Sequence, residues 1–333
     1  MKTTEIRFGI IGRNFVTDMM LDAMAAVPEI EVSAVYSRDA EAAAPFAAAH
    51  GFPYSFSDLN DLAACPHIDA VYIASPNSCH YEQAKIMLNA GKHVLCEKPA
   101  CSNADQVREL VSLAAGKNLV FLEAMRPVFA PQMKIVRDLL PKIAPLRQIA
   151  FFYCKPSSRY RLFLEKGNSV NTFNPELSNA AVMDLGCYGI HSLVYLFGRP
   201  LSVCAASSHL ENGFEAGGTV LMQYPGFTAS VTYSKVSYLS LPSVLSGENG
   251  MIFLDQVNHT ERMWIRMNGE PECDAGFRKP LPNDMTFELG SFYHFISEEV
   301  QPLQENENSI ITAEILDEVR RQTGTVFPAD KKH

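Results

Sequence analysis

In the first third of the chain, short apolar segments alternate with segments whose apolar residues recur at helical spacing. The expected strands are 7–11, 31–36, 69–74, 93–96 and 119–123. The expected helices are 15–27, 39–50, 80–89 and 103–115. This repeated strand–helix order predicts a parallel sheet with helices on both of its faces. Because ligands of such sheets bind beyond the carboxyl ends of the strands, the segments that follow the strands are the candidate site.

The pattern changes near residue 145, where strand-like segments follow one another with short turns between them. The expected strands are 148–154, 201–209, 219–224, 227–236 and 250–254. The expected helices are 183–197, 286–300 and 313–323. Strands in succession predict a mainly antiparallel sheet with helices on one face. The other face is expected to be open and apolar, and large exposed patches of that kind usually pair with another subunit.

The charge balance argues against nucleic acid as a partner. The 333 residues include 28 Lys and Arg against 37 Asp and Glu, a formal net charge of −9, whereas nucleic-acid binding requires basic patches. The N-terminal residues lack the pattern of a signal peptide, and no apolar run approaches the roughly 20 residues of a membrane span. We therefore expect a cytoplasmic protein that binds a small-molecule substrate, without nucleic-acid or membrane partners.

Neither the histidines nor the cysteines are spaced as metal ligands. The chain contains no His-Glu-x-x-His motif and no Cys-x-x-Cys pair. The 8 cysteines are scattered through apolar surroundings, which is typical of buried free thiols rather than of a disulfide framework. No metal site is expected.

Segment 9–17, with the sequence Gly-Ile-Ile-Gly-Arg-Asn-Phe-Val-Thr, ends the first strand and opens the first helix. A dinucleotide-binding Rossmann turn would read Gly-x-Gly-x-x-Gly/Ala from Gly12, with helix N-terminal amides holding the phosphate charge. Here Asn14 and Thr17 replace the later small residues, and Asn tolerates a positive φ better than most residues. A plain strand-to-helix turn is the alternative. The candidate cofactor-binding residues of this turn are Gly9, Gly12, Arg13, Asn14 and Phe15.

Cofactor preference is predicted from the end of the second strand. NAD-preferring sites usually place Asp or Glu there to bind the ribose hydroxyls, but this chain has Ser37 and Arg38. A hydroxyl and a guanidinium suit a 2′-phosphate, so NADP(H) is expected to be preferred over NAD(H). The alternative is an ordinary surface arginine, with Asp39 capping the next helix.

Three further segments follow expected strands or open an expected helix. They are 73–80 (Ile-Ala-Ser-Pro-Asn-Ser-Cys-His), 91–99 (Gly-Lys-His-Val-Leu-Cys-Glu-Lys-Pro) and 183–191 (Met-Asp-Leu-Gly-Cys-Tyr-Gly-Ile-His). In this order, and with the late turn 247–250, they closely resemble the glucose–fructose oxidoreductase and inositol dehydrogenase family (Gfo/Idh/MocA) over nearly the whole chain. The Asp-x-Gly-x-Tyr form looks most like the dihydrodiol dehydrogenase branch.

The resemblance implies an α/β fold. An N-terminal Rossmann domain with a parallel, doubly wound sheet is expected over residues 1–123. A C-terminal α+β domain with an open, mostly antiparallel sheet is expected over residues 124–333, where it would bind substrate and support a homodimer or homotetramer.

The resemblance also implies catalytic roles. Lys98 matches the family's catalytic lysine, and Asp184 matches the acidic residue before the second-domain helix. Tyr188 occupies the position where inositol-dehydrogenase-like members carry a catalytic His, whereas His191 does not match that position. A tyrosine hydroxyl can give or take the proton of a carbonyl or alcohol, and a nearby ammonium favours its phenolate form. The residues expected to line the cofactor cleft are Ser75, Asn77, His80, Glu97, Lys98 and Arg126.

Each of these residues has a structural alternative. Lys98 could be a solvated loop lysine paired with Glu97, and Asp184 a helix N-terminal acid favoured by the dipole. Tyr188 and His191 could be packing residues. For the cleft residues the alternatives are an Asx-turn at Asn77, a helix N-terminal His at position 80 and a boundary salt bridge at position 126.

The leading hypothesis is an NAD(P)-dependent oxidoreductase that transfers a hydride between the nicotinamide and a sugar, polyol, diol or related carbonyl. A second hypothesis is a non-catalytic sensor of dinucleotide or sugar, which would not need Lys98, Asp184 and Tyr188 together. A third is an enzyme that retains its cofactor and moves hydride between two sugars. Substrate specificity is expected from the second-domain sheet and from loop 157–175, which carries Arg159, Arg161 and Lys166.

Overall fold

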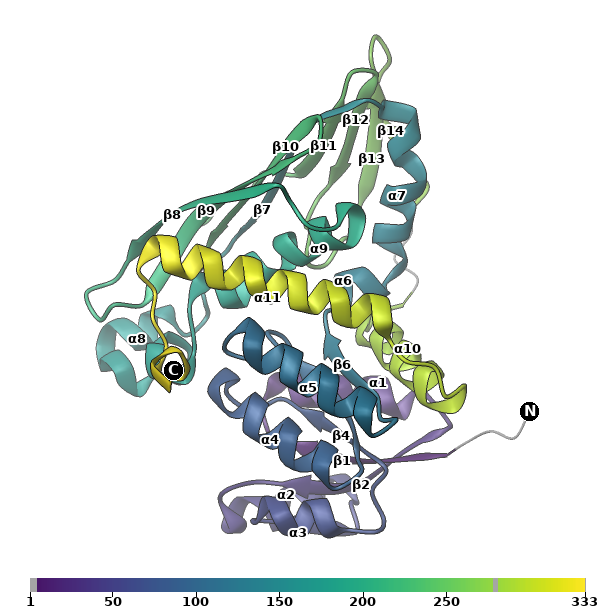
Figure 1. Ribbon diagram of the computed structural model, residues 1–333, viewed down its shortest axis with the longest axis vertical. Coiled ribbons are helices and arrows are strands. Elements are labelled where there is room, and N and C mark those ends of the chain that lie inside the picture. Colours follow the sequence, from purple (N-terminus) through teal and green to yellow (C-terminus); the bar gives the residue numbers. More distant parts are fainter. Residues whose placement is uncertain (1–4, 278–280, 333) are drawn as a thin grey trace. The chain divides into compact units, whose positions relative to one another are not determined.

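The computed structural model describes residues 5–277 and 281–332, and the chain forms two compact units. The first unit comprises the chain up to Ala124 together with Asn283–Ile310. The second comprises Met125–Pro282 and the chain from Ile311 onward. Figure 1 shows both units and labels many of their helices and strands.

The first unit is built on a parallel sheet with strand order β3-β2-β1-β4-β5-β6. Its strands are β1 (Ile6–Ile11), β2 (Ile30–Tyr36), β3 (Tyr54–Phe56), β4 (Ala70–Ile73), β5 (His93–Glu97) and β6 (Phe121–Ala124). The order reverses between β1 and β4, which is the doubly wound Rossmann arrangement and places a ligand-binding crevice at that edge. The predicted Rossmann sheet is confirmed.

Helices connect these strands and flank the sheet. They are α1 (Phe15–Ala25), α2 (Ala40–His50), α3 (Leu59–Ala64), α4 (Asn77–Asn89) and α5 (Ala104–Gly116). Figure 1 shows α4 and α5 side by side over the sheet. The strand β3 and the helix α3 were not predicted, because three residues are too few to show an alternating pattern.

A later segment also belongs to the first unit. Helix α10 (Met285–Ser297) packs against α1, and the ring of Phe292 lies 5.8 Å from that of Phe8 in β1. The Asn283 amide donates a hydrogen bond of 2.7 Å to the carbonyl of Met19. The sequence-based division left this segment with residues 124–333. The structure differs because apolar contacts formed across about 280 residues leave no local signal in the sequence.

The second unit is built on an eight-stranded sheet with order β14-β13-β12-β11-β7-β10-β9-β8. Strands β7 and β10 pair in parallel, and the other pairings among the described residues are antiparallel, as predicted. The strands are β7 (Leu146–Cys154), β8 (Ser202–His209), β9 (Glu215–Tyr224), β10 (Phe227–Ser234), β11 (Ser243–Gly247), β12 (Gly250–Leu254), β13 (Met263–Met267) and β14 (Cys273–Asp274).

Helices lie along one face of this sheet. Helix α7 (Pro131–Ile143) contacts β12, and α9 (Cys187–Phe197) contacts β7 and β10 (Figure 1). The unit also contains α6 (Arg126–Phe129), α8 (Tyr160–Lys166), the π-helix η4 (Val182–Gly186) and the 3-10 turns η1 (Gly167–Ser169), η2 (Asn171–Phe173), η3 (Pro175–Leu177) and η5 (Pro328–Lys332). The division between the units falls within α11 (Leu303–Thr323).

Two glycines let α9 approach the sheet closely. A Cβ at Gly189 would stand 2.7 Å from Cγ1 of Val231, and a Cβ at Gly186 would stand 3.0 Å from the ring of Tyr233. Both partners lie on β10. Because larger residues would push the helix away, these glycines hold the segment that carries Asp184 and Tyr188 against the sheet.

One stretch, Pro175–Phe197, is long and apolar enough by composition to cross a membrane, although the sequence analysis found no such run. In its most apolar window, 78% of the residues are buried within the protein. Burial of this extent is what a core helix shows, and the stretch ends in α9, which supports the sheet.

All eight cysteines are free. Five are buried and Cys79 is half-buried, but Cys204 and Cys273 are exposed. The expectation that all the thiols are buried is therefore wrong for these two, which lie in β8 and β14. In alternating strands one face is solvent-accessible, so apolar sequence neighbours do not guarantee burial.

Candidate active site

The first turn of the Rossmann unit depends on Gly12. Its φ is +116°, and a Cβ at this position would lie 2.5 Å from the carbonyl oxygen of Ala74 at the end of β4. Only glycine accepts this combination of conformation and close approach. The turn thus brings the chain close to the carboxyl end of the neighbouring strand, in the cradle that a dinucleotide phosphate requires.

Asn14 and Thr17 form the N-terminal cap of α1. The Asn14 side-chain oxygen accepts hydrogen bonds from the backbone N–H of Val16 (2.8 Å) and of Thr17 (3.3 Å). The Thr17 hydroxyl accepts one from the backbone N–H of Asn14 at 3.3 Å, which completes a capping box. The Asn14 amide also donates to the carbonyl of Ala74 at 2.7 Å.

The replaced fingerprint positions are therefore compatible with a phosphate-binding turn. Asn14 has φ −137°, so the suggestion that Asn serves here by tolerating a positive φ is wrong; Gly12 alone provides that conformation. The positive end of the α1 dipole faces the turn. Arg13 and Phe15 are both exposed beside it, and the Arg13 guanidinium lies 6.0 Å from the ring centre of Phe46.

Ser37 and Arg38 follow β2 at the same edge of the sheet. The backbone N–H of Ser37 donates to the carbonyl of Phe56, and its hydroxyl accepts from the N–H of Asp39 at 3.3 Å. Asp39 caps α2 by accepting from the N–H of Glu41, as the alternative reading expected. Arg38 is exposed, so its guanidinium is available to an anionic ligand at this position.

The segment after β5 carries Lys98 and is held from two sides. The hydroxyl of Tyr72 in β4 donates to Glu97 at 2.7 Å, and the backbone N–H of Lys98 donates to Glu97 at 3.3 Å. Burial and the Glu97 carboxylate raise the pKa of Tyr72 well above its ordinary value, so this phenol stays protonated as a donor. Lys98 is half-buried.

A buried glutamate holds the next residue of this segment. Glu123 in β6 is 6% exposed and accepts a hydrogen bond of 2.9 Å from the backbone N–H of Ala100. Burial raises its pKa, while hydrogen bonds from Ser309 and Ala100 and the charge of Lys98 oppose this rise. Glu123 was not among the residues expected from the sequence. The signal that could have identified it is the presence of a glutamate within the apolar run 119–125.

His80 joins the two loops that follow β4 and β5. Its Nε2 lies 2.8 Å from the carbonyl of Ser75 and its Nδ1 lies 3.0 Å from the carbonyl of Pro99. The ring is 1% exposed, and burial lowers its pKa. This geometry gives His80 a positioning role between the loops.

The other expected cleft residues lie at the ends of elements. Asn77 is half-buried in the first turn of α4, and the hydroxyl of Ser75 donates to Gln83 at 2.6 Å. Arg126 begins α6 in the second unit and is half-buried.

In the second unit, Asp184 lies in the π-helix η4, immediately before α9. The backbone N–H of Cys187 bonds to the carbonyl of Val182, five residues back. Such wide turns are rare in proteins, and those that occur are often found at functional sites. The Asp184 side chain is 36% exposed and forms an ion pair of 2.5 Å with Lys235. Lys235 follows β10, and no pattern in the sequence pointed to it.

Tyr188 lies in the first turn of α9, next to β7. Its ring meets that of Tyr153 edge-on, with ring centres 5.8 Å apart, and the residue is 7% exposed. Tyr153 lies near the carboxyl end of β7, which pairs in parallel with β10. Tyr188 and Asp184 are therefore both near the carboxyl ends of the parallel strand pair.

His191 is a core residue. It is 2% exposed, and burial lowers its pKa to about 3, so the imidazole is neutral at physiological pH. This burial supports the interpretation of His191 as a packing residue.

A second buried carboxyl lies beside η4. Glu215 is 1% exposed and accepts from the backbone N–H of Val182 at 2.8 Å. Burial raises its pKa to about 7, against the charge of Lys235, which lowers it. Burial and Glu215 also raise the pKa of Tyr233. Like Lys235, Glu215 was not identified from the sequence.

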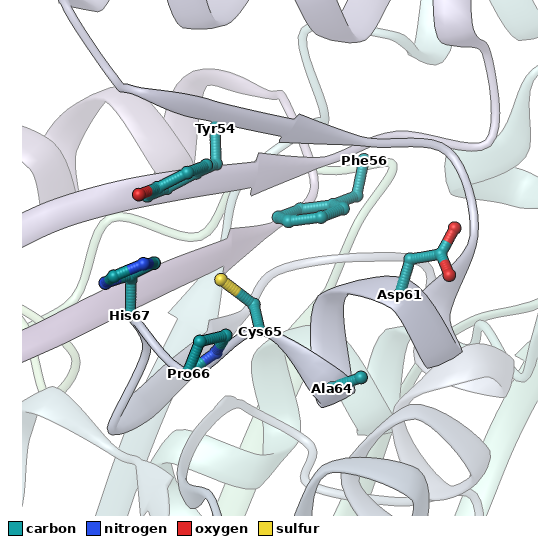
Figure 2. A pocket seen from close by; sticks show the side chains of 7 residues that line it. All are labelled: Tyr54, Phe56, Asp61, Ala64, Cys65, Pro66 and His67. Carbon is teal, nitrogen blue, oxygen red and sulfur yellow. The ribbon is translucent and has the colours of Figure 1, made fainter.

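A pocket of different character lies at the outer edge of the Rossmann sheet (Figure 2). The rings of Tyr54 and His67 are stacked there, with centres 5.1 Å apart and planes at 5°. Figure 2 shows Tyr54 and Phe56 on β3, facing Cys65, Pro66 and His67 of the loop after α3. The lining residues are Tyr54, Phe56, Asp61, Ala64, Cys65, Pro66 and His67. None of them is an expected site residue, so we assign this pocket no part in the chemistry.

The first unit thus brings together the Gly12 turn, Ser37, Arg38, Ser75, His80 and Lys98 at one edge of its sheet, because the carboxyl ends of parallel strands share that edge. The second unit brings together Asp184, Tyr188 and Lys235. Within residues 5–277 and 281–332, no group of three or more His, Cys, Asp or Glu side chains is placed to hold a metal ion.

Both halves of the chain match known family models. Residues 6–124 match the oxidoreductase family with an NAD-binding Rossmann fold, and residues 148–253 match the GFO/IDH/MocA C-terminal domain. The chain belongs to the Gfo/Idh/MocA oxidoreductase family.

Individual relatives of this Gfo/Idh/MocA protein extend over its full length. It is 42% identical to the scyllo-inositol 2-dehydrogenase (NADP(+)) IolU of Bacillus subtilis, covering 98% of this chain and 99% of that protein. It is 28% identical to the trans-1,2-dihydrobenzene-1,2-diol dehydrogenase of Mus musculus, with the same coverage.

A solved structure shares the fold. The 3-ketoreductase KijD10 of Actinomadura kijaniata, determined in complex with NADP and TDP-benzene, has a TM-score of 0.86 and 24% sequence identity. The match covers 97% of this chain and 99% of that one. The predicted family and two-part fold are confirmed, and so is the prediction of an NAD(P)-dependent oxidoreductase.

Proposed function

We propose that this Gfo/Idh/MocA protein is an NADP(H)-dependent dehydrogenase or reductase whose substrate is a polyol, sugar or diol or the corresponding carbonyl. The observation that carries the proposal is the Lys98 segment, which Tyr72, His80 and Glu123 hold at the carboxyl edge of the Rossmann sheet. A lysine whose side chain only contacted solvent would not require three separate hydrogen bonds to hold its loop. The inositol and dihydrodiol substrates in the names of the relatives are polyhydroxylated or diol compounds.

The residues present fit a dinucleotide. A Cβ at Gly12 would fill the cradle of the first turn, and α1 presents the positive end of its dipole there. The bound nicotinamide supplies or accepts the hydride. We assign cofactor contacts to residues of this edge, namely Gly9, Gly12, Arg13, Asn14, Phe15, Ser37, Arg38, Ser75, Asn77, Glu97 and Lys98, and to Arg126 of the second unit. His80 acts by holding the loops.

NADP(H) is the preferred cofactor. The exposed Arg38 follows β2, where an acidic residue would repel a 2′-phosphate, and Ser37 contributes a hydroxyl. Arg provides a planar fork of donors that matches phosphate oxygens. The name of the 42% identical relative also specifies NADP(+).

We assign Lys98, Asp184 and Tyr188 to the chemistry. Lys98 donates a hydrogen bond to the reacting oxygen of the substrate and stabilises charge as it develops. Tyr188 gives or takes the proton on that oxygen. Asp184 accepts a hydrogen bond from a substrate hydroxyl and so orients the ring or chain.

Two further assignments are proposals of the same kind. The helix-free face of the second-unit sheet pairs with another copy in a homodimer or homotetramer. The exposed Leu221 on β9 and the stacked Phe253 and Trp264 on β12 and β13 support this pairing. Light scattering on the purified protein measures the assembly. A cytoplasmic location is supported by eight unpaired cysteines, which suit a reducing compartment.

The test is turnover of myo- or scyllo-inositol, glucose and a cyclic diol with NADP+ and NAD+, comparing the wild type with Lys98→Ala. We expect NADP+-dependent oxidation that falls by about 10²-fold or more in the variant, because a preorganised donor to the reacting oxygen is lost. NADPH binding, followed by its fluorescence, should persist in Lys98→Ala and weaken in Arg38→Ala. NADPH binding without Lys98-dependent turnover of any substrate would favour a sensor.

A further inference from the structure

We propose that Lys235 is a positioning residue of the active site, which holds the Asp184 carboxylate in one orientation for recognition of a substrate hydroxyl. The inference rests on the proposed function, because it gives Asp184 a task at the substrate. It adds a residue that the motif segments do not contain.

In this pair the cation is buried and the anion is more accessible to solvent. Nζ of Lys235 lies 2.5 Å from Oδ2 of Asp184, and the lysine side chain is only 5% exposed against 36% for the aspartate. The same ammonium lies 3.4 Å from the carbonyl of Thr172. The buried ammonium therefore contacts, from inside the unit, a carboxylate that is exposed enough for a ligand to reach.

Aromatic rings complete the surroundings of the ammonium. Nζ lies 5.5 Å from the ring centre of Phe173 and 5.8 Å from that of Phe214. Both rings are fully buried and belong to one apolar cluster. A cation between aromatic faces is favoured electrostatically, but the rings replace water and raise the cost of any motion away from Asp184.

The backbone of Lys235 is fixed as firmly as its side chain. Its N–H donates to the carbonyl of Ala216 in β9, and its carbonyl accepts from the N–H of Ser157 after β7. The segments beyond β7 and β10 thus continue to pair past the strand ends. Asp184 is fixed from its own side by η4, so the two charges meet with little freedom on either side.

Glu215 explains why the pair is specific. This carboxyl is also close enough for the charge of Lys235 to act on it. One of its oxygens, however, accepts a hydrogen bond from the N–H of Val182, the first residue of η4, whereas the ion pair of Lys235 is with Asp184. Lys235 therefore has Asp184 as its ion-pair partner, and Glu215 orders the turn that presents Asp184.

A purely stabilising role is a poor explanation for such a pair. Taking the Lys235 ammonium out of water costs free energy that its attraction to a partly exposed carboxylate barely repays, so the pair is weak evidence for stability. A fixed acceptor is in contrast what orientation of a hydroxyl requires. The pair thus predicts a substrate that donates a hydrogen bond from a hydroxyl near the reacting carbon.

The experiment compares Lys235→Met, Lys235→Arg and Lys134→Met with the wild type and Lys98→Ala. Lys134 forms an exposed pair of 2.7 Å with Asp138 on α7, so its removal is the matched control. For each protein we measure kcat and KM for a polyol that the wild type oxidises, together with NADPH affinity. Lys235→Met should lose about tenfold or more in kcat/KM for the polyol. Its NADPH affinity should stay within twofold of the wild type. Lys235→Arg should recover much of the loss, and Lys134→Met should lose nothing.

Asp184→Asn and the double variant Asp184→Asn/Lys235→Met complete a cycle. If Lys235 acts through Asp184, adding Lys235→Met to Asp184→Asn should cause little further loss of kcat/KM. The double variant leaves no uncompensated charge, so it keeps the test valid if Lys235→Met alone does not fold. Additive losses, or wild-type kinetics in Lys235→Met, overturn the inference.

The proposed function is judged separately by the wild type and Lys98→Ala. Lys98-dependent turnover with unchanged kinetics in Lys235→Met would leave that function intact and remove only the role of Lys235. Absence of turnover in the wild type would remove the proposed function, and with it any role of Lys235 in substrate recognition.

Discussion

In the first unit, the segment that carries Lys98 is held mainly by hydrogen bonds between side chains and backbone atoms, whereas in the second unit the Asp184 carboxylate is held by an ion pair with the buried Lys235. His80 and Glu123 bond to the backbone of Pro99 and Ala100. Lys235 instead bonds to the carboxylate of Asp184 itself. Backbone contacts fix the path of a loop whatever side chains it carries. A side-chain pair fixes one functional group and depends on both partners.

This difference separates two ways of building a site. The Rossmann unit shapes a surface for a large cofactor, so the steric fit of backbone segments dominates. The second unit positions single polar groups, so buried charge dominates. We therefore expect substitutions to lower stability or activity mainly through steric strain in the first unit and mainly through changes of buried charge in the second.

The largest effect is expected for Gly12→Ala. The residue has φ +116°, and its new methyl group would meet the carbonyl oxygen of Ala74 at 2.5 Å. The backbone conformation alone costs about 1–3 kcal/mol for a residue with a Cβ, and the contact with backbone adds to it. We expect a loss of unfolding free energy of about 3 kcal/mol or more, with weaker NADPH binding.

Gly189→Ala is the counterpart in the second unit. Its methyl group would meet Cγ1 of the buried Val231 at 2.7 Å, a side-chain atom rather than a backbone atom, and the φ of Gly189 is not positive. Alanine also favours a helix over glycine by about 1 kcal/mol. Urea unfolding should show a smaller loss than for Gly12→Ala, and equal losses would mean that steric fit is no more critical in the first unit.

The next effect is the pH dependence of stability that Glu215 contributes to the second unit. Burial raises its folded pKa to about 7, above the ordinary value of 4.5. The folded state therefore binds the proton more tightly than the unfolded state does. The protonated carboxyl thus contributes stability that is fully present below pH 4.5 and is lost as the pH rises toward 7. The shift corresponds to about 3 kcal/mol.

Glu215→Gln keeps the neutral form at every pH. Between pH 4.5 and 7.5, the unfolding free energy of the wild type should fall relative to that of the variant by about 3 kcal/mol. Glu165→Gln changes an exposed carboxyl on α8 and should leave the wild-type profile unchanged. Parallel profiles for Glu215→Gln and the wild type would show that folding does not raise the pKa of this carboxyl.

The smallest effect concerns the cap of α1. Asn14→Ala removes the two cap hydrogen bonds and the bond to Ala74. A lost N-cap costs about 0.5–2 kcal/mol, and we expect the upper half of that range. Asp58→Ala removes the cap bond to Asn60 on the short helix α3 and should cost less. A thermal shift for Asn14→Ala no larger than that for Asp58→Ala would show that the contact with β4 adds nothing.

Much of the Rossmann unit could be predicted because its signals are local. The expected strands 7–11, 31–36 and 93–96 match β1, β2 and β5 to within one residue at each end. Asp39, Asn103 and Gly51 cap their helices as their residue types suggest. The early start of α4 at Asn77 and the strand β3 were missed, because Pro76 reads as a turn and a three-residue strand has no period.

The second unit was less accessible to prediction. The strands β7, β8, β10 and β12 were identified, but β11, β13 and the helix α7 were not. Helix α7 contains Pro131 and Pro141, which argue against a helix when read locally. Pro131 is in fact at the first helical position, where it is tolerated.

The sequence by itself determined the family, most of the strand–helix order of the Rossmann unit, the Rossmann turn and the three motif residues, Lys98, Asp184 and Tyr188. All of these are encoded in short segments, where neighbouring residues decide conformation and chemistry. Only the tertiary structure decided what holds them. The return of segment 283–310 to the first unit, the bond from Ala100 to Glu123 and the pair of Lys235 with Asp184 join residues far apart in the chain. Contacts of this kind depend on which strands become neighbours, and a buried charge reveals its partner only once the chain has folded around it.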